Sequence, residues 1–527
     1  MEQFSKLIKT LKQNCKTIEQ VHQVHAQAIT RGLISFNPTF LGEILHTFTS
    51  LLTTSPLSKP INLIHYATTL FNFIPCPSTF CFNNIIRAYT LLSFPEIAFT
   101  LFTKMAQLSI PPDTHTFPFA LKACAQINSL SLAKTLHSQA LKFGFLADIF
   151  VCNNLINVYC IGGDVHNAHN LFDESSYRDI VSYNSLIDGF VKAGETDKAK
   201  ELFDQMARRD AVSWGTLLAG YAKMNQCKEA IELFDQMLVS EVKPDDVPLA
   251  AALSACAQLG ELEKGKRIHD FILQNRIRMS VFLLTGLVDL YAKCGCIETA
   301  RVIFESSREK NLYTWNAMLV GLAMHGHGKL LLDYFTKMVD DGGVKPDRVT
   351  FLGVLTGCSH AGLVDEARRL FAEMECVYGV PKDRKHFGCM ADLLGRAGLI
   401  EEAVEMIDAM PMQGDVYVWG GLLGGCRMHG NIEIAEKAAE HVMALKPEDG
   451  GVYSVLANIY ANAERWGDLV RVRRLRNSGM VKKNAGCSLI QLNGTRHEFV
   501  AGDDLHPLSN EIYSVLNVLE KHKVEAF

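Results

Sequence analysis

The sequence predicts an all-α protein, a right-handed α-solenoid of antiparallel helix-pair repeats. The first observation is an internal echo, because the segment 181–190 returns with drift at 79–86, 211–218 and 312–319. The second is a near copy of Ala-x-x-Leu-Phe-x-x-Met further along each unit. The third is size, because a unit of roughly 31–36 residues cannot bury its own apolar face and must stack on its neighbours.

Two amphipathic stripes in each unit predict its two helices. The apolar residues of 180–210 recur twice at i, i+3, i+4 and i+7, which is the spacing of one helix face. The two stripes are Tyr183, Leu186, Ile187 and Phe190, then Ala199, Leu202, Phe203 and Met206. Ala193-Gly194 supplies the break between the two helices.

Alignment on these stripes divides the middle of the chain into successive units. Their bounds are 79–113, 114–148, 149–179, 180–210, 211–245, 246–280, 281–311, 312–347, 348–383 and 384–415. Several units end in Pro-Asp, as at 112–113, 244–245 and 346–347. Proline stops the second helix, and the aspartate favours the N-terminus of the next one.

The flanks carry weaker versions of the pattern. Residues 3–78 are interpreted as two degraded units with a loop near 50–61, where Ser, Thr and Pro are frequent. After 415, Trp419 heads one loose helix pair and Tyr453 another, and the periodicity fades beyond about 485. Four lysines between residues 6 and 16 are compatible with an organelle transit peptide and equally with a basic first helix.

Composition excludes several classes of protein. Hydrophobic residues make up 48% of the chain, so it can bury a core. The net charge of −5 means that any nucleic-acid binding must depend on a local groove. The fifteen cysteines contain no C-x-x-C pair, which predicts reduced thiols. No apolar run is long enough for a membrane span.

At this level of detail the chain resembles the plant pentatricopeptide repeat family, in the subclass that mixes units of three lengths. The resemblance covers nearly the whole chain. The residues that carry it include Thr314-Trp315-Asn316, Leu253-Ser254-Ala255-Cys256, and the stretches 289–295, 358–364 and 392–398. The stretch 419–431 resembles the start of the family's C-terminal E extension, and 456–461 with Arg465-Trp466 resembles its second half.

The resemblance implies a domain organisation. It predicts a targeting or degenerate-repeat region at 1–78, an array of about ten repeats at 79–415, an E extension at 416–484 and a shortened tail at 485–527. In the tail, Gly486-Cys487-Ser488 and His497-Glu498-Phe499 resemble the segment that leads into the family's deaminase domain. Ala485 replaces the proline usual there, and Leu489 replaces the tryptophan.

The resemblance also implies a function, namely sequence-specific binding of single-stranded organelle RNA to select a cytidine for C-to-U editing. Each base is read by the fifth and the last residue of a repeat, and short polar side chains suit that task. The uridine-type pairs are Asn83 with Asp113, Asn153 with Asp179, Asn184 with Asp210, and Asn316 with Asp347, and the adenine-type pair is Thr285 with Asn311. They predict the target 5′-U-x-U-U-x-x-A-U-x-x. Pro118, Gly215, Ala250, Leu352 and Gly388 depart from the readable combinations.

No catalytic machinery is predicted. The family's deaminase needs H-x-E and C-x-x-C to hold zinc and move a proton, and neither motif occurs in this chain. We therefore expect no catalytic residue, metal or cofactor, and a deaminase of the DYW type supplied in trans together with accessory editing proteins. Met324-His325-Gly326-His327 is interpreted as surface histidines at a turn. The expected location is the mitochondrion, with the chloroplast as the alternative.

Two other functions compete with editing. A helical solenoid can serve as a scaffold that binds proteins, and an RNA-binding array can act in splicing or transcript stability. The candidate readers also have a purely structural explanation, because asparagine in a first helical turn is often a cap and aspartate after proline often closes a turn.

Overall fold

The computed structural model describes residues 7, 9–11, 13, 15–32, 38–54, 60–340, 343–478, 486–492, 495–502 and 505–525. The chain divides into two compact halves, Met1–Ala255 and Cys256–Phe527. Helices occupy most of the described residues of both halves, and two helices fall within each of the ten predicted units. The all-α repeat fold predicted from the sequence is therefore observed.

The N-terminal half is a stack of helix pairs. Three helices precede the first predicted unit: α2 (Ile18–Thr30), α3 (Pro38–Thr54) and α4 (Pro60–Asn72). The pairs that follow are α5 (Thr79–Leu91) with α6 (Pro95–Gln107), α7 (Thr116–Ile127) with α8 (Leu130–Lys142), α9 (Ile149–Ile161) with α10 (Val165–Glu174), α11 (Ile180–Ala193) with α12 (Thr196–Gln205), and α13 (Ala211–Lys223) with α14 (Cys227–Val239). A short 3₁₀ turn, η1 (Phe145–Ala147), precedes α9, and α15 (Asp246–Leu259) runs across the boundary between the halves.

The C-terminal half continues the same scheme and ends differently. Its helices are α16 (Leu262–Gln274), α17 (Val281–Lys293), α18 (Ile297–Ser306), α19 (Leu312–Met324), α20 (Gly328–Asp340), α21 (Arg348–Ala361), α22 (Val364–Cys376), α23 (Arg384–Arg396), α24 (Ile400–Asp408), α25 (Val416–His429), α26 (Ile432–Leu445), α27 (Gly450–Asn462) and α28 (Trp466–Ser478). An antiparallel hairpin follows, with β1 (Cys487–Leu492) paired to β2 (Thr495–Val500) so that Cys487 lies opposite Val500. The last element is α29 (Ser509–Glu525).

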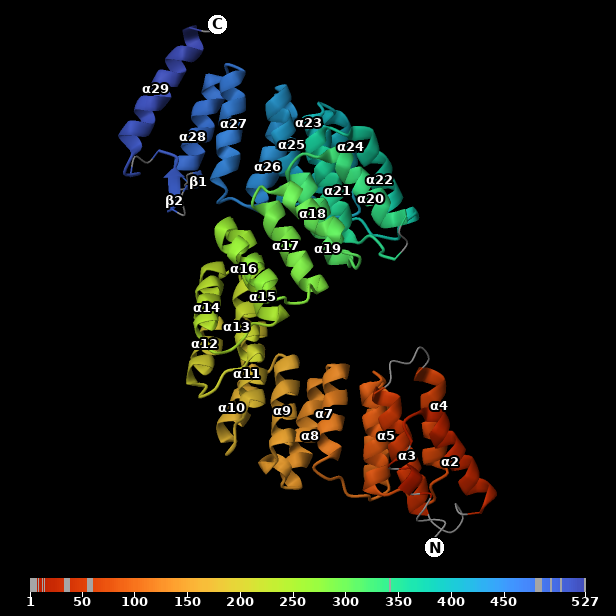
Figure 1. The fold of residues 1–527 in the computed structure, drawn as a ribbon. Helices are drawn as coiled ribbons and strands as arrows, with labels where there is room; N and C mark the ends of the chain where they lie inside the picture. Colours follow the sequence, from red (N-terminus) through yellow and green to blue (C-terminus); the bar gives the residue numbers. More distant parts are fainter. Residues whose placement is uncertain are drawn as a thin grey trace. The chain divides into compact units, whose positions relative to one another are not determined.

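Within each half, the first helices of successive repeats pack on one another. Helices α5, α7, α9, α11 and α13 form one such row in the N-terminal half, and α17, α19, α21, α23, α25 and α27 form another in the C-terminal half (Figure 1). Each first helix also packs against its own second helix, as α25 does against α26. The first helices are therefore contacted on several sides, which explains why they carry most of the buried residues.

Polar residues set where these helices begin and end. Asp179 caps α11, because its side chain accepts from the Ser182 N–H at 2.9 Å, and Asp210 caps α13 in the same way. At the other end of α11, Gly194 has a φ of 82°, a left-handed conformation that glycine adopts without steric cost. The Ala-Gly break predicted between the two helices of 180–210 is thus a helix C-cap.

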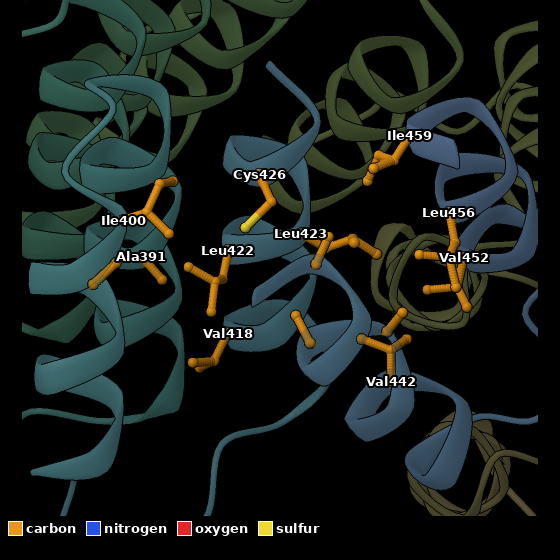
Figure 2. Packing of buried hydrophobic residues seen from close by; sticks show 14 of the residues in the cluster. Ala391, Ile400, Val418, Leu422, Leu423, Cys426, Val442, Val452, Leu456 and Ile459 are labelled. Carbon is orange, nitrogen blue, oxygen red and sulfur yellow. The ribbon is translucent and has the colours of Figure 1, made fainter. Parts of the chain in front are cut away.

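The core is a continuous apolar layer between helices. In the C-terminal half, α25 is in the middle of one such layer: Leu422 points toward Ala391 of α23, and Leu423 lies on the side of α27, near Val442 and Leu456 (Figure 2). These side chains are nearly inaccessible to water, and burying each contributes roughly 1.5–3 kcal/mol of stability. Several thiols share this environment, and burial raises the pKa of Cys426 to about 11.

The loop predicted near 50–61 is wrong over most of its described length. Helix α3 continues to Thr54, and α4 begins at Pro60. Residues 55–59 lie outside the described residues. The Thr53 hydroxyl donates to the Thr49 carbonyl at 3.0 Å, and Thr49 donates to the Leu45 carbonyl at 2.8 Å. The threonine hydroxyls are thus satisfied inside the helix, and proline fits the first turn of α4.

The N-terminal prediction is only partly visible, because Lys6 and Lys12 lie outside the described residues. Leu7 and Leu11 are buried. In the tail, Ala485 and Asp503 also lie outside the described residues. None of the helices that the structure describes is long and apolar enough to span a bilayer.

A glycine contact between α23 and α25 gives a prediction about stability. An alanine Cβ at position 425 would lie 2.4 Å from the Gly395 Cα, so Gly425→Ala forces the two helix backbones apart. We expect a loss of about 1–3 kcal/mol, which is typical of overpacking, and a lower unfolding midpoint by circular dichroism.

The matched control is Gly424→Ala, one residue along the same helix. A Cβ at 424 meets no atom within 4 Å, so the gain in helix propensity, about 0.5–1 kcal/mol, should leave the midpoint unchanged or raise it. Equal midpoints for the two variants would contradict the proposed close contact.

Candidate nucleic-acid interface

Each predicted uridine-type pair is joined by a direct hydrogen bond. The amide Nδ2–H of the asparagine donates to Oδ1 of the aspartate that ends the same repeat, just before the first helix of the next one. The N···O distances are 2.9 Å for Asn83–Asp113, 3.0 Å for Asn153–Asp179, 3.2 Å for Asn184–Asp210 and 3.1 Å for Asn316–Asp347. The structure thus brings together residues that lie about one repeat apart in sequence.

A hydroxyl group completes three of these four contacts. Ser182 Oγ donates to Asn153 Oδ1 at 2.6 Å, and Thr350 Oγ1 donates to Asn316 Oδ1 at the same distance. Thr116 Oγ1 donates to Asn83 Oδ1 at 2.7 Å. The hydroxyl residue lies three positions after the aspartate, in the first turn of the next helix. We call the asparagine, the aspartate and this hydroxyl residue a triad.

The triads are less exposed than free reading groups would be. Asn153 and Asn316 each retain 7% exposure, while Asn83 and Asn184 are half-buried, as are the four aspartates. Two of the four asparagines are therefore largely covered. Burial of an amide is stable only when its polar atoms are hydrogen-bonded, and the triad supplies those bonds.

Asn184 is the exception among the four. The Ser213 hydroxyl donates to Asp210 Oδ1 at 2.8 Å and makes no bond to the asparagine. Asn184 Oδ1 is buried without a hydrogen-bond partner. An acceptor in that state costs free energy until a donor reaches it, so this position is the one most clearly open to a ligand N–H.

The aspartates of the triads are held in the ionised form. Burial alone would raise the pKa of Asp113, but the hydrogen bonds from Asn83, from the Thr116 hydroxyl and from backbone N–H groups outweigh it and lower the pKa. The same balance lowers the pKa of Asp179, Asp210 and Asp347. Each carboxylate therefore presents negative charge and acceptor oxygens at neutral pH.

The adenine-type pair is organised differently. Thr285 and Asn311 share no direct bond. Thr285 Oγ1 lies 2.8 Å from Thr314 Oγ1, which in turn donates to Asn311 Oδ1 at 3.0 Å. Thr285 Oγ1 also donates to the carbonyl of Val281 at 2.8 Å. Asn311 caps α19, so it takes the structural place that aspartate has in the other repeats.

The structural explanation offered for the readers is therefore half right. The last residue of a repeat is a helix cap, since Asp179, Asp210 and Asp347 each close a capping box. The fifth residue is not a cap of its own helix, because its amide donates to the aspartate at the end of its repeat, which caps the first helix of the next repeat.

Repeats with glycine at the fifth place carry hollows. One, of about 360 Å³ in the N-terminal half, is lined by Gly215 together with Val212, Val247 and Lys192. Another, of about 550 Å³ in the C-terminal half, is lined by Gly388, Gly420 and Tyr417. Gly215 and Gly388, two of the residues that depart from the readable combinations, thus leave open space where the triads have an asparagine side chain.

A row of exposed apolar side chains was not identified from the sequence. The second residue of most repeats is a large apolar residue open to solvent: Phe80, Phe150, Val181, Val212, Val247, Phe282, Tyr313, Val349 and Tyr417. It lies three residues before the fifth, on the same helix face, and members of both sets line the two hollows. Exposure of an apolar residue at a fixed place in successive repeats is a signal of binding, and its period is visible in the sequence.

No metal site is found where the sequence offered weak candidates. His325 Nε2 bonds to the Ala292 carbonyl at 2.8 Å, and the His325 and His327 ring centroids are 6.4 Å apart. In the part of the chain that the structure describes, no three His, Cys, Asp or Glu residues are grouped so that they could hold a metal ion. His497 and His506 approach within 2.9 Å as an isolated pair.

Family models match much of the chain. The model described as "PPR repeat" matches residues 80–110, 150–180, 282–312, 313–343, 349–376 and 386–415, and a second model of that description matches 177–207. The "PPR repeat family" model matches 209–258. The "E motif" model matches 429–491.

Curated relatives and a solved structure agree with these matches. Pentatricopeptide repeat-containing protein At5g61800 of Arabidopsis thaliana is 56% identical over 90% of this chain and 97% of its own length. The Arabidopsis protein At5g66520 of the same description is 46% identical over 97% of this chain and 81% of its own length. The crystal structure of the pentatricopeptide repeat protein PPR10 from maize has the same fold, with a TM-score of 0.52 and 17% identity over 91% of this chain and 84% of that chain. The chain belongs to the pentatricopeptide repeat family.

Proposed function

We propose that the protein binds single-stranded RNA with sequence specificity and selects a cytidine for C-to-U editing of an organelle transcript. The observation that carries the proposal is the triad, which recurs at the fifth place of four repeats with the same donor, acceptor and distances. Membership of the family supports it, since RNA binding is the function that the resemblance implies.

The triad suits uracil for a chemical reason. An amide nitrogen has two N–H groups, and the bond to aspartate uses one of them, so the other can donate to a uracil carbonyl. The ionised aspartate retains a second carboxylate oxygen that can accept from a donor on the base or from a bridging water. Each contact is worth only about 0.5–1.5 kcal/mol, so specificity requires several repeats acting together.

The exposed second residues support binding of unpaired bases. Aromatic and branched side chains such as Phe150, Val181 and Tyr313 offer flat apolar surface beside the triads. Stacking on such surfaces tolerates any base, so it supplies affinity while the triads supply selectivity. A scaffold that binds proteins would not require amide groups in phase with this row.

The finer parts of the proposal concern editing. We propose the organisation 1–78, 79–415, 416–484 and 485–527 as N-terminal region, repeat array, E extension and tail. The match of the E motif to 429–491 supports a C-terminal extension beyond the repeats. In this proposal the array finds the RNA, and the extension recruits a deaminase of the DYW type with accessory proteins.

The mitochondrion is the proposed location, with the chloroplast as the alternative. Two of the Arabidopsis relatives carry the word chloroplastic in their names, at 38% and 41% identity, which favours the alternative. Import of the labelled full chain into isolated mitochondria and chloroplasts would decide between the two organelles.

One prediction concerns the affinity of the protein for RNA. Asn184→Ala should weaken binding to the U-rich target roughly fivefold, because it removes one hydrogen-bonding side chain worth about 1 kcal/mol. A gel-shift titration with the target and a scrambled strand measures the effect. The change loses the bond from Asn184 Nδ2 to Asp210 but no bond at Oδ1, and Asp210 keeps its two bonds from Ser213, so the fold should be disturbed little.

The control is Asn154→Ala, which removes a half-buried asparagine whose amide bonds only to its own helix, at the Phe150 carbonyl. This variant should bind like the unaltered protein. Equal affinity of the unaltered protein for target and scrambled strands would remove the claim of specific RNA binding.

Another prediction concerns C-to-U conversion by the purified protein. The purified protein should leave a bound target RNA unedited, since H-x-E and C-x-x-C are absent from its sequence. Conversion is measured by sequencing the RNA after incubation with and without a DYW-type deaminase. Robust C-to-U conversion without any added protein would contradict recruitment in trans.

A further inference from the structure

Helix α28 belongs to the last helix pair of the stack, and much of its surface is left uncovered. It packs side by side with α27, the first helix of the same pair (Figure 1). Leu469 and Val472 are the residues of α28 that join the apolar core of this half. Among the described residues, no helix or strand other than α27 packs closely against α28. The outer face of such a terminal helix is normally polar, so exposed apolar side chains on it indicate a binding surface.

One flank of α28 combines apolar and basic side chains. Trp466 and Val470 lie four residues apart and so share a helix face, and Arg473 and Arg474 continue that flank one turn further. Trp466 is 62% exposed and Val470 is 43% exposed, and both arginines are exposed. We call these four residues the α28 flank.

The positive charge of the α28 flank is not neutralised by the helix itself. The acidic residue of α28 is Asp468, which accepts from Arg465 Nε at 2.7 Å and lies 3.2 Å from the guanidinium of Arg471. Neither Arg473 nor Arg474 makes an ion pair with any residue that the structure describes. The flank therefore presents two unpaired guanidinium groups beside an exposed indole ring.

This combination is typical of surfaces that bind proteins. Tryptophan and arginine are enriched among the residues that dominate the free energy of protein association. A guanidinium group binds a carboxylate through two parallel hydrogen bonds, which gives the contact a fixed direction. The indole of Trp466 and the side chain of Val470 offer apolar surface next to these charges. A segment that carries carboxylates and an apolar side chain would complement both parts of the flank.

An RNA strand and a membrane surface match the α28 flank less well. The asparagines of the triads lie on first helices of their repeats, whereas α28 is a second helix, so the flank does not continue the row of candidate readers. Val470 offers a base neither a ring for stacking nor a hydrogen bond. A helix that lies on a membrane needs a broad apolar face, but Leu469 and Val472 are buried in the core and only Trp466 and Val470 remain on this flank.

We propose that the α28 flank docks an acidic segment of a partner protein, with carboxylates of the segment on Arg473 and Arg474 and one of its apolar side chains on Trp466. The inference rests on the proposed recruitment by the C-terminal extension and deepens it, because it names the surface and the chemistry of the partner. Docking uses neither the triads nor bound RNA, so it can be measured apart from RNA binding.

The first test is a selection from a display library of random peptides on the immobilised full chain. The recovered peptides should be rich in Asp and Glu and should carry a large apolar residue. A variant with Arg473→Glu and Arg474→Glu reverses the charge of the flank and should not recover them. Absence of acidic peptides from the selection on the unaltered protein would overturn the proposal.

The matched control carries Arg276→Glu and Arg278→Glu. These two arginines are exposed in the connection between α16 and α17, and the change in net charge is the same. This variant should recover the same acidic peptides as the unaltered protein. Equal loss of the peptides in both double variants would assign the selection to overall charge and would overturn the proposal.

The affinity of a selected peptide measures the apolar and the charged part of the flank separately. By fluorescence anisotropy, Trp466→Ala should weaken binding roughly tenfold or more, as expected of an anchor residue. Salt at about 1 M, where the Debye length is about 3 Å, should weaken binding to the unaltered protein as well. Tyr177→Ala removes an aromatic residue that is 75% exposed in the N-terminal half and should leave the affinity unchanged. Thermal unfolding checks that each variant is folded.

Two competitors distinguish the proposed partner from other occupants. A saturating amount of the U-rich RNA should leave the affinity for the peptide unchanged, and so should vesicles that contain an anionic lipid. Displacement of the peptide by the RNA would assign the flank to nucleic acid, and displacement by the vesicles would assign it to a membrane surface. Either result would overturn the proposal.

The docking surface and the proposed function fail in different ways. If the protein prefers the U-rich target to a scrambled strand but selects no acidic peptide, only the docking surface is wrong. If acidic peptides bind through the flank but the RNA preference is absent, the proposed RNA binding is wrong and the docking surface remains.

Discussion

The hydrogen bond between the fifth residue of a repeat and the aspartate that ends the same repeat is the interaction on which the candidate interface depends. Asp179 Oδ1 accepts from Asn153 at 3.0 Å and from the Ser182 N–H at 2.9 Å, so one atom both caps α11 and ties it to α9. If α11 began one residue earlier or later, its face would turn by roughly 100° and the contact would break. The same two hydrogen bonds therefore fix the start of the helix, the register of the repeats and the position of the candidate reading group.

This arrangement has a consequence for recognition. The triads are assembled within the protein itself, so an RNA strand meets polar groups whose directions are already set, and little side-chain entropy is lost on binding. The cost is that each asparagine offers the base only what the triad leaves over, one N–H and the nearby carboxylate oxygen. Because each such contact contributes little free energy, specific binding would require a long array of repeats.

The period of the sequence predicted the helix pairs, whereas the partners in the Asn–Asp contacts were implied by the resemblance to the family. The predictions that failed concern features that depend on the contacts and hydrogen-bond partners of individual side chains. Residues 50–54 were predicted as loop from their composition, yet Thr53 bonds to its own helix. Phe150 and Tyr313 were not singled out from the sequence, and the packing shows that they are exposed. The hydroxyls of Ser182 and Thr350 were overlooked because a short side chain carries no periodic signal.

The glycines of α25 show how one residue type can serve two purposes in a single helix. In the sequence, Gly424-Gly425 is followed by Cys426-Arg427 and lacks the Lys-Ser/Thr of a phosphate-binding loop. In the structure, Gly421 and Gly425 lie against the backbone of α23, where a Cβ would collide with Asp392 and Gly395, whereas Gly420 and Gly424 face open space. The first pair brings α25 close enough to α23 to form a wall, and Gly420 leaves that wall unfilled. Close packing and an open hollow are thus produced by the same short run of glycines, and a helix of the C-terminal extension becomes continuous with the surface of the repeats.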